Sequence, residues 1–354
     1  MKVLFHLLDA GTGGGQLVAA RVAARLVDRG DDVGVAVPGP GPALESFEAL
    51  GAQVAFVDAG TLRRPLSGRS LARILEPYDL LYSHTEIPGV ILGAFAAKST
   101  RRPHVVHQHN APYFSPSRPV QLAQKALFRA VIGPARFIAV AEHVRVGLEA
   151  AGVRGNRVEV VPNGVPSFEA PAPRASDVVT VGMLARLDPR KKVDVFLEAA
   201  ARAEPATPVR YVVGGVSGPF AEYESAVREQ AAAVGIEIVH TERGTEFLCG
   251  LDIVVIPSSY EGAPLVLLEA MALGRAVIAS DIPGMREVIE PDHAGILVPP
   301  GDPGALATAI ETLVDDADRQ EDLGERARAV AGARYGLSAM LERTLVILEE
   351  SAGG

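Results

Sequence analysis

Cysteine is almost absent from this sequence. Its 354 residues include one, Cys249, so no internal disulfide can form, and one cysteine with scattered histidines makes no recognisable zinc site. We therefore expect a reducing compartment such as the cytoplasm, and no bound metal.

Long apolar runs are also missing. Although 48% of the residues are hydrophobic, no stretch approaches the roughly 20 apolar residues that cross a bilayer. The first residues lead directly into a predicted strand, whereas a secretory signal places a longer apolar segment before small residues. We expect a soluble chain, and its length suits two domains better than one.

The chain has no excess of positive charge. Its net charge of −9 argues against a general nucleic-acid binder, whose surface must be basic. Residues 98–154 nevertheless contain nine basic and two acidic residues. A solvated basic face is the simpler interpretation. The alternative is a surface for an anionic acceptor or membrane, with an interfacial helix over 118–129 that carries Leu122, Leu127 and Phe128.

Short apolar runs alternate with helical periodicity along the chain, which predicts parallel-sheet α/β architecture. Proline-rich sequence at about 162–176 interrupts this alternation and predicts a linker. We expect two Rossmann-like, doubly wound domains, 1–165 and 176–336, facing a central cleft at the carboxyl ends of their strands. The expected strands are 3–8, 33–37, 54–57, 80–83, 104–107, 137–140, 158–161, 178–183, 209–213, 236–239, 253–256, 276–279 and 296–298.

A glycine loop, Gly11–Gly15, lies between the first predicted strand and a helix predicted over 16–28. Glycines there let backbone N–H groups approach a phosphate at a helix N-terminus. A dinucleotide fingerprint would need glycine in place of Gln16 and an acidic residue at the end of the second strand. Both are missing, which excludes the dehydrogenase interpretation. A plain tight turn remains the alternative.

Four cations, Arg186, Arg190, Lys191 and Lys192, follow the predicted strand 178–183 and precede a helix. Positive charge beside a helix N-terminus opposes the macrodipole unless an anion binds there. A diphosphate would supply that anion. A solvated basic loop is the alternative.

Two glutamates follow the predicted strand 253–256. Glu261 lies in a polar loop, Pro264 stands where a first helical position favours proline, and Glu269 comes about two turns into the helix. One carboxylate could bind sugar hydroxyls, and the other the paired hydroxyls of a ribose. The alternative for Glu269 is an exposed helix position.

Together these motifs resemble those of the family 4 glycosyltransferases of the GT-B fold. The run 259–280, with glutamates separated by seven residues, resembles the family's donor motif, and 161–165 its interdomain signature. Gly13 and Gly14 resemble the N-terminal glycine loop. Segment 182–186 with Lys191 resembles the phosphate-binding pair.

The resemblance implies roles for individual residues. Arg186 and Lys191 would neutralise the leaving diphosphate, Glu261 would hold the transferred sugar, and His109 would reach that sugar, with His107 as the competing assignment. Lys192 stands where the family usually has glycine, and could share the phosphate role. The implied donor-binding residues are Gly13, Gly14, Lys192, Gly262, Ala263, Pro264, Leu265 and Glu269.

The implied activity is that of a retaining, metal-independent, hexosyltransferase-type enzyme with a nucleotide-diphosphate-sugar donor. Its acceptor would be read by loops 60–69 and 110–118, and helix 337–354 would pack back on the first domain. A nucleotide-sugar epimerase of the same fold and a non-catalytic sugar-nucleotide-binding subunit are the alternatives.

Overall fold

The computed structural model describes residues 1–57, 66–114, 117–169, 177–241 and 243–353. The chain forms two units. Unit 1 comprises Met1–Asn163 with Ser338–Gly354, and unit 2 comprises Gly164–Leu337. Among the residues described, no helix has both the length and the apolar character needed to cross a bilayer.

Unit 1 is built on a seven-stranded parallel sheet in the order β3-β2-β1-β4-β5-β6-β7. All seven strands predicted for this half of the chain are present. They are β1 (Lys2–Leu7), β2 (Asp32–Val37), β3 (Gln53–Phe56), β4 (Leu80–His84), β5 (His104–Gln108), β6 (Arg136–Ala139) and β7 (Val158–Val160).

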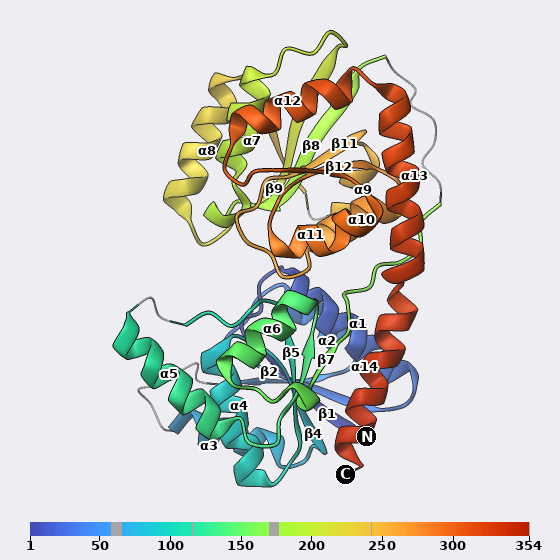
Figure 1. Cartoon of the computed structure of the whole chain (residues 1–354). Helices are drawn as coiled ribbons and strands as arrows, with labels where there is room; N and C mark the ends of the chain where they lie inside the picture. The colour runs from blue at the N-terminus through green and yellow to red at the C-terminus, as the bar shows by residue number, and fades with distance from the viewer. Residues whose placement is uncertain (58–65, 115–116, 170–176, 242, 354) are drawn as a thin grey trace. The chain divides into compact units, whose positions relative to one another are not determined.

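Helices cover both faces of this sheet, with α3 packed on α4 on one side and α1 and α14 on the other (Figure 1). Salt bridges tie α14 to the rest of unit 1, because Glu349 pairs with Arg29 and Glu350 with Arg136. The helices are α1 (Gly14–Asp28), α2 (Ala43–Ala49), α3 (Leu66–Leu75), α4 (Ile87–Thr100), α5 (Arg118–Val131), α6 (Glu142–Ala151) and α14 (Leu337–Ala352).

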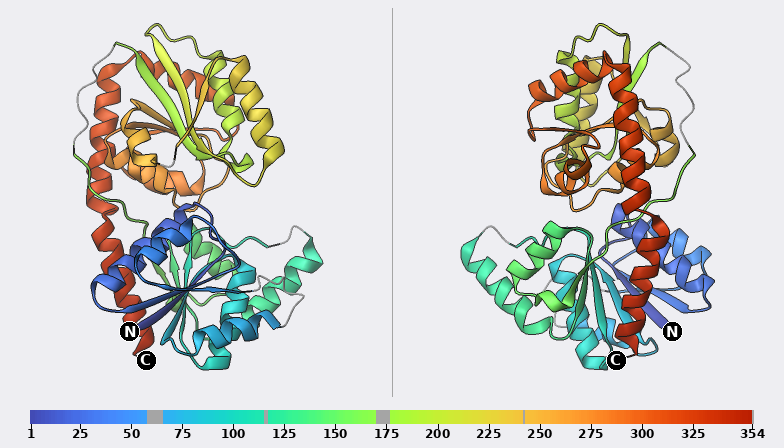
Figure 2. Two further views of the ribbon diagram at one scale, coloured as in Figure 1. Left: turned by 180° about the vertical axis from the view of Figure 1, so that it is seen from behind. Right: turned by 45° about the vertical axis from the view of Figure 1, so that its right-hand side comes forward.

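Unit 2 repeats the design with six parallel strands in the order β10-β9-β8-β11-β12-β13. These are β8 (Val179–Arg186), β9 (Val209–Val216), β10 (Glu237–His240), β11 (Ile253–Ile256), β12 (Ala276–Ser280) and β13 (Ile296–Val298). The helices, seen again in Figure 2, are α7 (Val193–Arg202), α8 (Ala221–Ala233), α9 (Gly244–Cys249), α10 (Leu265–Ala272), α11 (Pro283–Ile289), α12 (Pro303–Val314) and α13 (Ala317–Arg334). The prediction of two doubly wound parallel sheets is confirmed.

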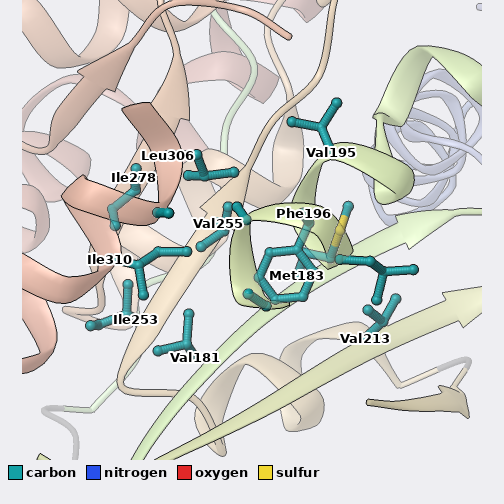
Figure 3. Packing of buried hydrophobic residues seen from close by; sticks show 14 of the residues in the cluster. Val181, Met183, Val195, Phe196, Val213, Ile253, Val255, Ile278, Leu306 and Ile310 are labelled. Carbon is teal, nitrogen blue, oxygen red and sulfur yellow. The ribbon is translucent and has the colours of Figure 1, made fainter. Parts of the chain in front are cut away.

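Buried side chains from β8, β11, α7 and α12 form the core on one face of the unit 2 sheet. Figure 3 shows Val181 and Met183 of β8 beside Phe196 of α7. Strand β8 is longer than predicted, because Leu184–Arg186 continue the ladder with Gly214–Val216 of β9. Arg186 is therefore the last residue of the strand and not a loop residue.

The segment predicted as a linker lies partly within the described residues. Val165 donates its N–H to the Tyr335 carbonyl (2.9 Å) and accepts from the N–H of Leu337 (2.9 Å), so the chain enters unit 2 beside the point where it leaves. Residues 170–176 lie outside the described residues, as do 60–65 and 115–116 of the two loops expected to read the acceptor.

Each sheet has one point at which its strand order reverses, between β1 and β4 in unit 1 and between β8 and β11 in unit 2. Connections leave such a point in opposite directions, so a crevice opens at the carboxyl ends of the two strands. The predicted site residues follow these strands or their immediate neighbours.

Candidate active site

Asp188 organises the cations at the end of β8. Its carboxylate, only 1% exposed, accepts from Arg186 Nη2 (3.2 Å) and from Arg190 Nη2 (2.9 Å). Burial alone raises the pKa of Asp188, but hydrogen bonds and charge from Arg190 and Arg186 outweigh it and lower the pKa to about 2. Two of the four cations are thus held by one permanent anion. The sequence pattern did not predict this role, although an aspartate before proline is typical of a helix start.

Lys191 reaches the other half of the site. Its Nζ lies 2.5 Å from Glu261 Oε1, and the N–H of Ser259 donates to the Arg190 carbonyl (2.8 Å). This hydrogen bond ties the loop after β11 to the short 3-10 turn Pro189–Lys191. The structure therefore brings a predicted phosphate-binding cation into contact with a predicted sugar-binding carboxylate.

Lys192 adopts a left-handed backbone conformation, with φ 56° and ψ 45°. Glycine occupies this region without steric cost, whereas other residues lose roughly 1–2 kcal/mol there. This conformation explains why glycine usually stands at this position in the family that the sequence resembles. The first amide of α7, Val193 N–H, donates to Tyr223 Oη (3.0 Å).

The second glutamate lies in α10, which begins one residue later than predicted. Pro264 is the N-cap residue and not the first helical residue, and no side chain caps the helix start. Glu269 lies in the second turn and is 7% exposed, so the alternative of an exposed helix position is wrong. Helix N-termini leave N–H groups for a ligand, and α10 begins at Leu265, four residues after Glu261.

Gly284 supports the Glu261 loop from the side. A Cβ atom at this position would lie 2.5 Å from the carbonyl oxygen of Glu261 and 2.6 Å from that of Gly262. Only glycine lets the start of α11 pack this closely against the loop. This contact could not be predicted from local sequence, because Gly284 follows a different strand, β12.

In unit 1, the glycine loop is shaped by side chains as well as by glycine. Gly13 is the N-cap of α1 and Gly14 its first residue, so the helix begins two residues earlier than predicted. Gln16 Nε2 donates to Asp9 Oδ1 (2.8 Å). A Cβ at Gly13 would lie 2.6 Å from Gln16 Oε1. A side chain at position 13 would displace the amide end of Gln16, which stands where a dinucleotide fingerprint would have glycine.

The two candidate histidines differ in their surroundings. His107 has no exposed surface, and its Nδ1 lies 2.6 Å from Tyr82 Oη. His109 is partly exposed and lies against the start of α1, where a Cβ at Gly15 would be 3.0 Å from His109 Cδ2. Burial lowers the pKa of His109 to about 4, so the ring is neutral at pH 7. Of the two, only His109 is placed to meet a ligand beside the glycine loop.

A separate cavity of about 1210 Å³ opens in unit 1 at the amino ends of the strands. Its lining includes Met1, Lys98, Arg101, His104 and Arg136, which lie at or near the amino ends of strands. Ligands of doubly wound sheets bind at the carboxyl ends, so we do not assign this cavity to the candidate site. In the part of the chain that the structure describes, no three His, Cys, Asp or Glu side chains are grouped as a metal site requires.

Comparison with known proteins agrees with this geometry. Residues 12–167 match the family described as Glycosyltransferase Family 4, and residues 167–330 match Glycosyl transferases group 1. A D-inositol 3-phosphate glycosyltransferase of Geodermatophilus obscurus is 32% identical over 325 residues, which cover 81% of this chain and 70% of the relative. The chain belongs to the family 4 glycosyltransferases. The resemblance identified from the motifs is confirmed.

Other relatives agree with this membership. The D-inositol 3-phosphate glycosyltransferase of Nocardia farcinica is 30% identical and matches 72% of this chain and 62% of its own length. Among solved structures, Anabaena Alr3699/HepE in complex with UDP-glucose has a TM-score of 0.84 at 23% identity, and covers 99% of this chain and 100% of its own. The family 4 glycosyltransferase described here shares this GT-B fold.

Proposed function

We propose that this chain transfers a sugar from a nucleotide-diphosphate-sugar to an acceptor hydroxyl, with retention of anomeric configuration. The observation that carries the proposal is the contact between Lys191 and Glu261 (2.5 Å) at the switch point of unit 2, where Arg186 ends β8. Cations for a diphosphate and a carboxylate for sugar hydroxyls meet at one place. The fold neighbour HepE holds UDP-glucose, which supports a donor of this class.

In the proposed reaction, the bond between the sugar and the diphosphate weakens first, and the acceptor hydroxyl attacks from the same face. The leaving diphosphate takes the hydroxyl proton. Arg186, Lys191 and the N-terminus of α10 stabilise the negative charge that develops on the diphosphate, which is the main task of such a site. Glu269 holds the ribose and Glu261 the transferred sugar, and His109 is the histidine proposed to contact that sugar.

We further propose that no divalent metal takes part, because fixed side-chain cations supply the positive charge. A thermal-shift panel tests the donor class and the metal independence together, using UDP-, GDP-, ADP- and dTDP-sugars with and without a chelator. A ligand at 100 times its Kd adds about 2.7 kcal/mol to the unfolding free energy. We expect one base to stabilise the chain selectively, with the same shift in chelator. Loss of the shift in chelator would contradict metal independence.

Product analysis separates this proposal from its alternatives. An epimerase would change the donor sugar without any acceptor, and a non-catalytic subunit would bind the donor without turnover. Relatives are named for inositol 3-phosphate and maltose-1-phosphate, so the acceptor screen should begin with phosphorylated cyclitols and sugars. A product that contains both donor sugar and acceptor, with retained configuration by NMR, is the expected outcome.

We also propose that α5 contacts an anionic membrane surface. It carries Arg118, Lys125 and Arg129 and no acidic residue. Leu122 (69% exposed) and Val120 (47%) are apolar and solvent-facing. Exposed apolar residues beside basic ones are typical of interfacial helices. Phe128, which was expected on the same apolar face, is instead buried in the core of unit 1.

Co-sedimentation with vesicles tests this contact. We expect the chain to bind vesicles that contain phosphatidylglycerol and not pure phosphatidylcholine, and Leu122→Glu to abolish binding. Val146→Glu is the matched control, because Val146 is 51% exposed on α6 of the same unit. Equal binding of the chain and both variants, or no binding to either vesicle, would exclude the contact.

A further inference from the structure

His109 is in contact with a second histidine that the proposed reaction does not use. His84, the last residue of β4, places its Nδ1 2.9 Å from His109 Nε2. The two rings lie 5.2 Å apart at an interplanar angle of 29°. His109 also stacks on His107 at 4.7 Å and 10°.

His84 itself is held firmly. It is 5% exposed, the Phe5 ring stacks on it at 6.0 Å, and the Tyr82 ring meets it edge-on at 4.5 Å. Its backbone carbonyl accepts from the Leu8 N–H (3.1 Å), which joins β4 to the end of β1. A ring packed on several sides presents its Nδ1 in one direction.

The direction of the hydrogen bond between the two rings follows from the proton count. Burial lowers the pKa of both histidines, so each ring holds one proton at neutral pH. His84 Nε2 is buried and has no hydrogen-bond partner among the described residues. A buried N–H without an acceptor is rarer in proteins than a buried acceptor without a donor. The His84 proton is therefore on Nδ1 and is donated to His109 Nε2.

This direction limits what His109 can do. Its Nε2 is occupied as an acceptor, so its single proton is on Nδ1. A neutral ring in this form offers a ligand an N–H donor and has no free basic nitrogen. His109 can then donate to a sugar oxygen, but it cannot accept the proton of the acceptor hydroxyl. That role is left to the leaving diphosphate, as in the proposed reaction.

We propose that His84 is a positioning residue, which donates from Nδ1 to His109 Nε2 and thereby fixes His109 as the Nδ1–H tautomer that donates to the donor sugar. The proposal rests on the role given to His109 under the proposed function. The contact joins the last residue of β4 to the residue that follows β5, and its partners are 25 residues apart in the chain.

The ¹⁵N chemical shifts of the histidine rings test the tautomer directly in the whole chain, with ¹⁵N-histidine and signals assigned from His109→Asn and His84→Asn. We expect His109 to have a protonated Nδ1 and a bare Nε2 in the wild-type protein. A bare Nδ1 on His109 would overturn the proposal. This result does not depend on any turnover, so it stands even if no sugar transfer is found.

Substitution of His84 tests the functional consequence. Asn places an amide N–H group near the position of the His84 Nδ1, whereas Leu removes this hydrogen-bond donor. We expect His84→Leu to change the His109 tautomer and lower kcat about tenfold, the factor of one hydrogen bond, while His84→Asn keeps both near wild type. His104→Gln, another buried histidine of unit 1, should change neither.

If His84→Leu left both the tautomer and kcat unchanged, His84 would have no positioning role. If His84→Asn lost activity as fully as His84→Leu while circular dichroism showed both folded, the hydrogen-bond donor at position 84 would not be what supports turnover. Either result overturns the proposal. If neither variant folds, the wild-type spectrum still decides it.

Discussion

Lys191 Nζ and Glu261 Oε1 lie 2.5 Å apart, so a predicted diphosphate ligand and a predicted sugar ligand neutralise each other in the free chain. A nucleotide-sugar that binds here must hydrogen-bond to the two side chains of this pair, either beside their mutual contact or in place of it. The phosphate takes the ammonium and a hydroxyl takes the carboxylate. The free site is thus held in shape by the groups that would bind the donor.

Glu261→Gln should therefore separate binding from turnover. Without the carboxylate, Lys191 is no longer neutralised and a diphosphate meets less repulsion. A charge interaction of about 1 kcal/mol corresponds to about fivefold in Kd. We expect the free nucleoside diphosphate chosen by the thermal-shift panel to bind about fivefold more tightly by calorimetry, while kcat falls. Weaker diphosphate binding would mean that Glu261 serves chiefly to hold Lys191 in place.

Arg186→Ala should lower kcat by about 10²–10³, the usual cost of losing one group that stabilises transition-state charge. Arg210→Ala is the matched control, because Arg210 is an exposed arginine of β9 that pairs with Glu237 at 3.4 Å. Initial rates of transfer measure both variants. Near-normal turnover of Arg186→Ala would remove Arg186 from the proposed mechanism.

Gly284→Ala should damage the site without touching a charged group. The new methyl would lie 2.5 Å from the Glu261 carbonyl oxygen, so the loop must move, and overpacking of this kind costs about 1–3 kcal/mol. We expect a lower midpoint of denaturant unfolding together with slower transfer. Gly332→Ala in α13 meets no atom within 4 Å and should stabilise the helix by about 0.5–1 kcal/mol. Equal effects of the two substitutions would contradict the close packing.

Buried histidines should make unit 1 sensitive to acid. Burial lowers the pKa of His6 to about 4, and burial together with the charge of His6 lowers that of His104 to about 3, both from 6.5. Below pH 6.5 the unfolded chain binds protons that the folded chain does not. Stability is therefore full above about pH 6.5 and falls as the pH drops toward 4, by about 1.4 kcal/mol per pH unit for each such residue.

Urea unfolding at pH 7.5, 6.0 and 5.0 measures this slope. His104→Gln keeps an amide nitrogen near Ser83 Oγ. We expect it to reduce the change in unfolding free energy per pH unit by about 1.4 kcal/mol, the contribution of one proton. His293→Asn, at an exposed position of unit 2, should leave it unchanged. A slope that is the same in all three proteins would show that His104 is protonated in the folded state.

Apolar periodicity predicted every strand, because a parallel strand buried on both faces must be apolar. It placed the end of β8 too early, since Arg186 is polar and yet continues the ladder with β9. Arg186, Lys191, Glu261 and Glu269 could be nominated from local spacing alone. The structure places the first three around one connected turn and loop, and buries the fourth in α10.

Other contacts had no local signal. Gly284 and Glu261 follow different strands, β12 and β11, and their approach depends on how two loops leave the sheet. His84 looks like an ordinary strand residue until the pairing of β4 with β5 brings it beside His109. Lys192 could be recognised as a departure from a family pattern, but the left-handed backbone that explains it appears only in the folded chain.

Val165 and Gly336 form a parallel bridge, so the chain enters and leaves unit 2 at adjacent points. In terms of chain path, unit 2 is an insertion into unit 1, closed by α14. Two cuts side by side would release it as a self-contained cassette. If unit 2 holds the donor as proposed, exchange of this cassette between relatives would transfer the choice of donor and leave the rest of the chain unchanged.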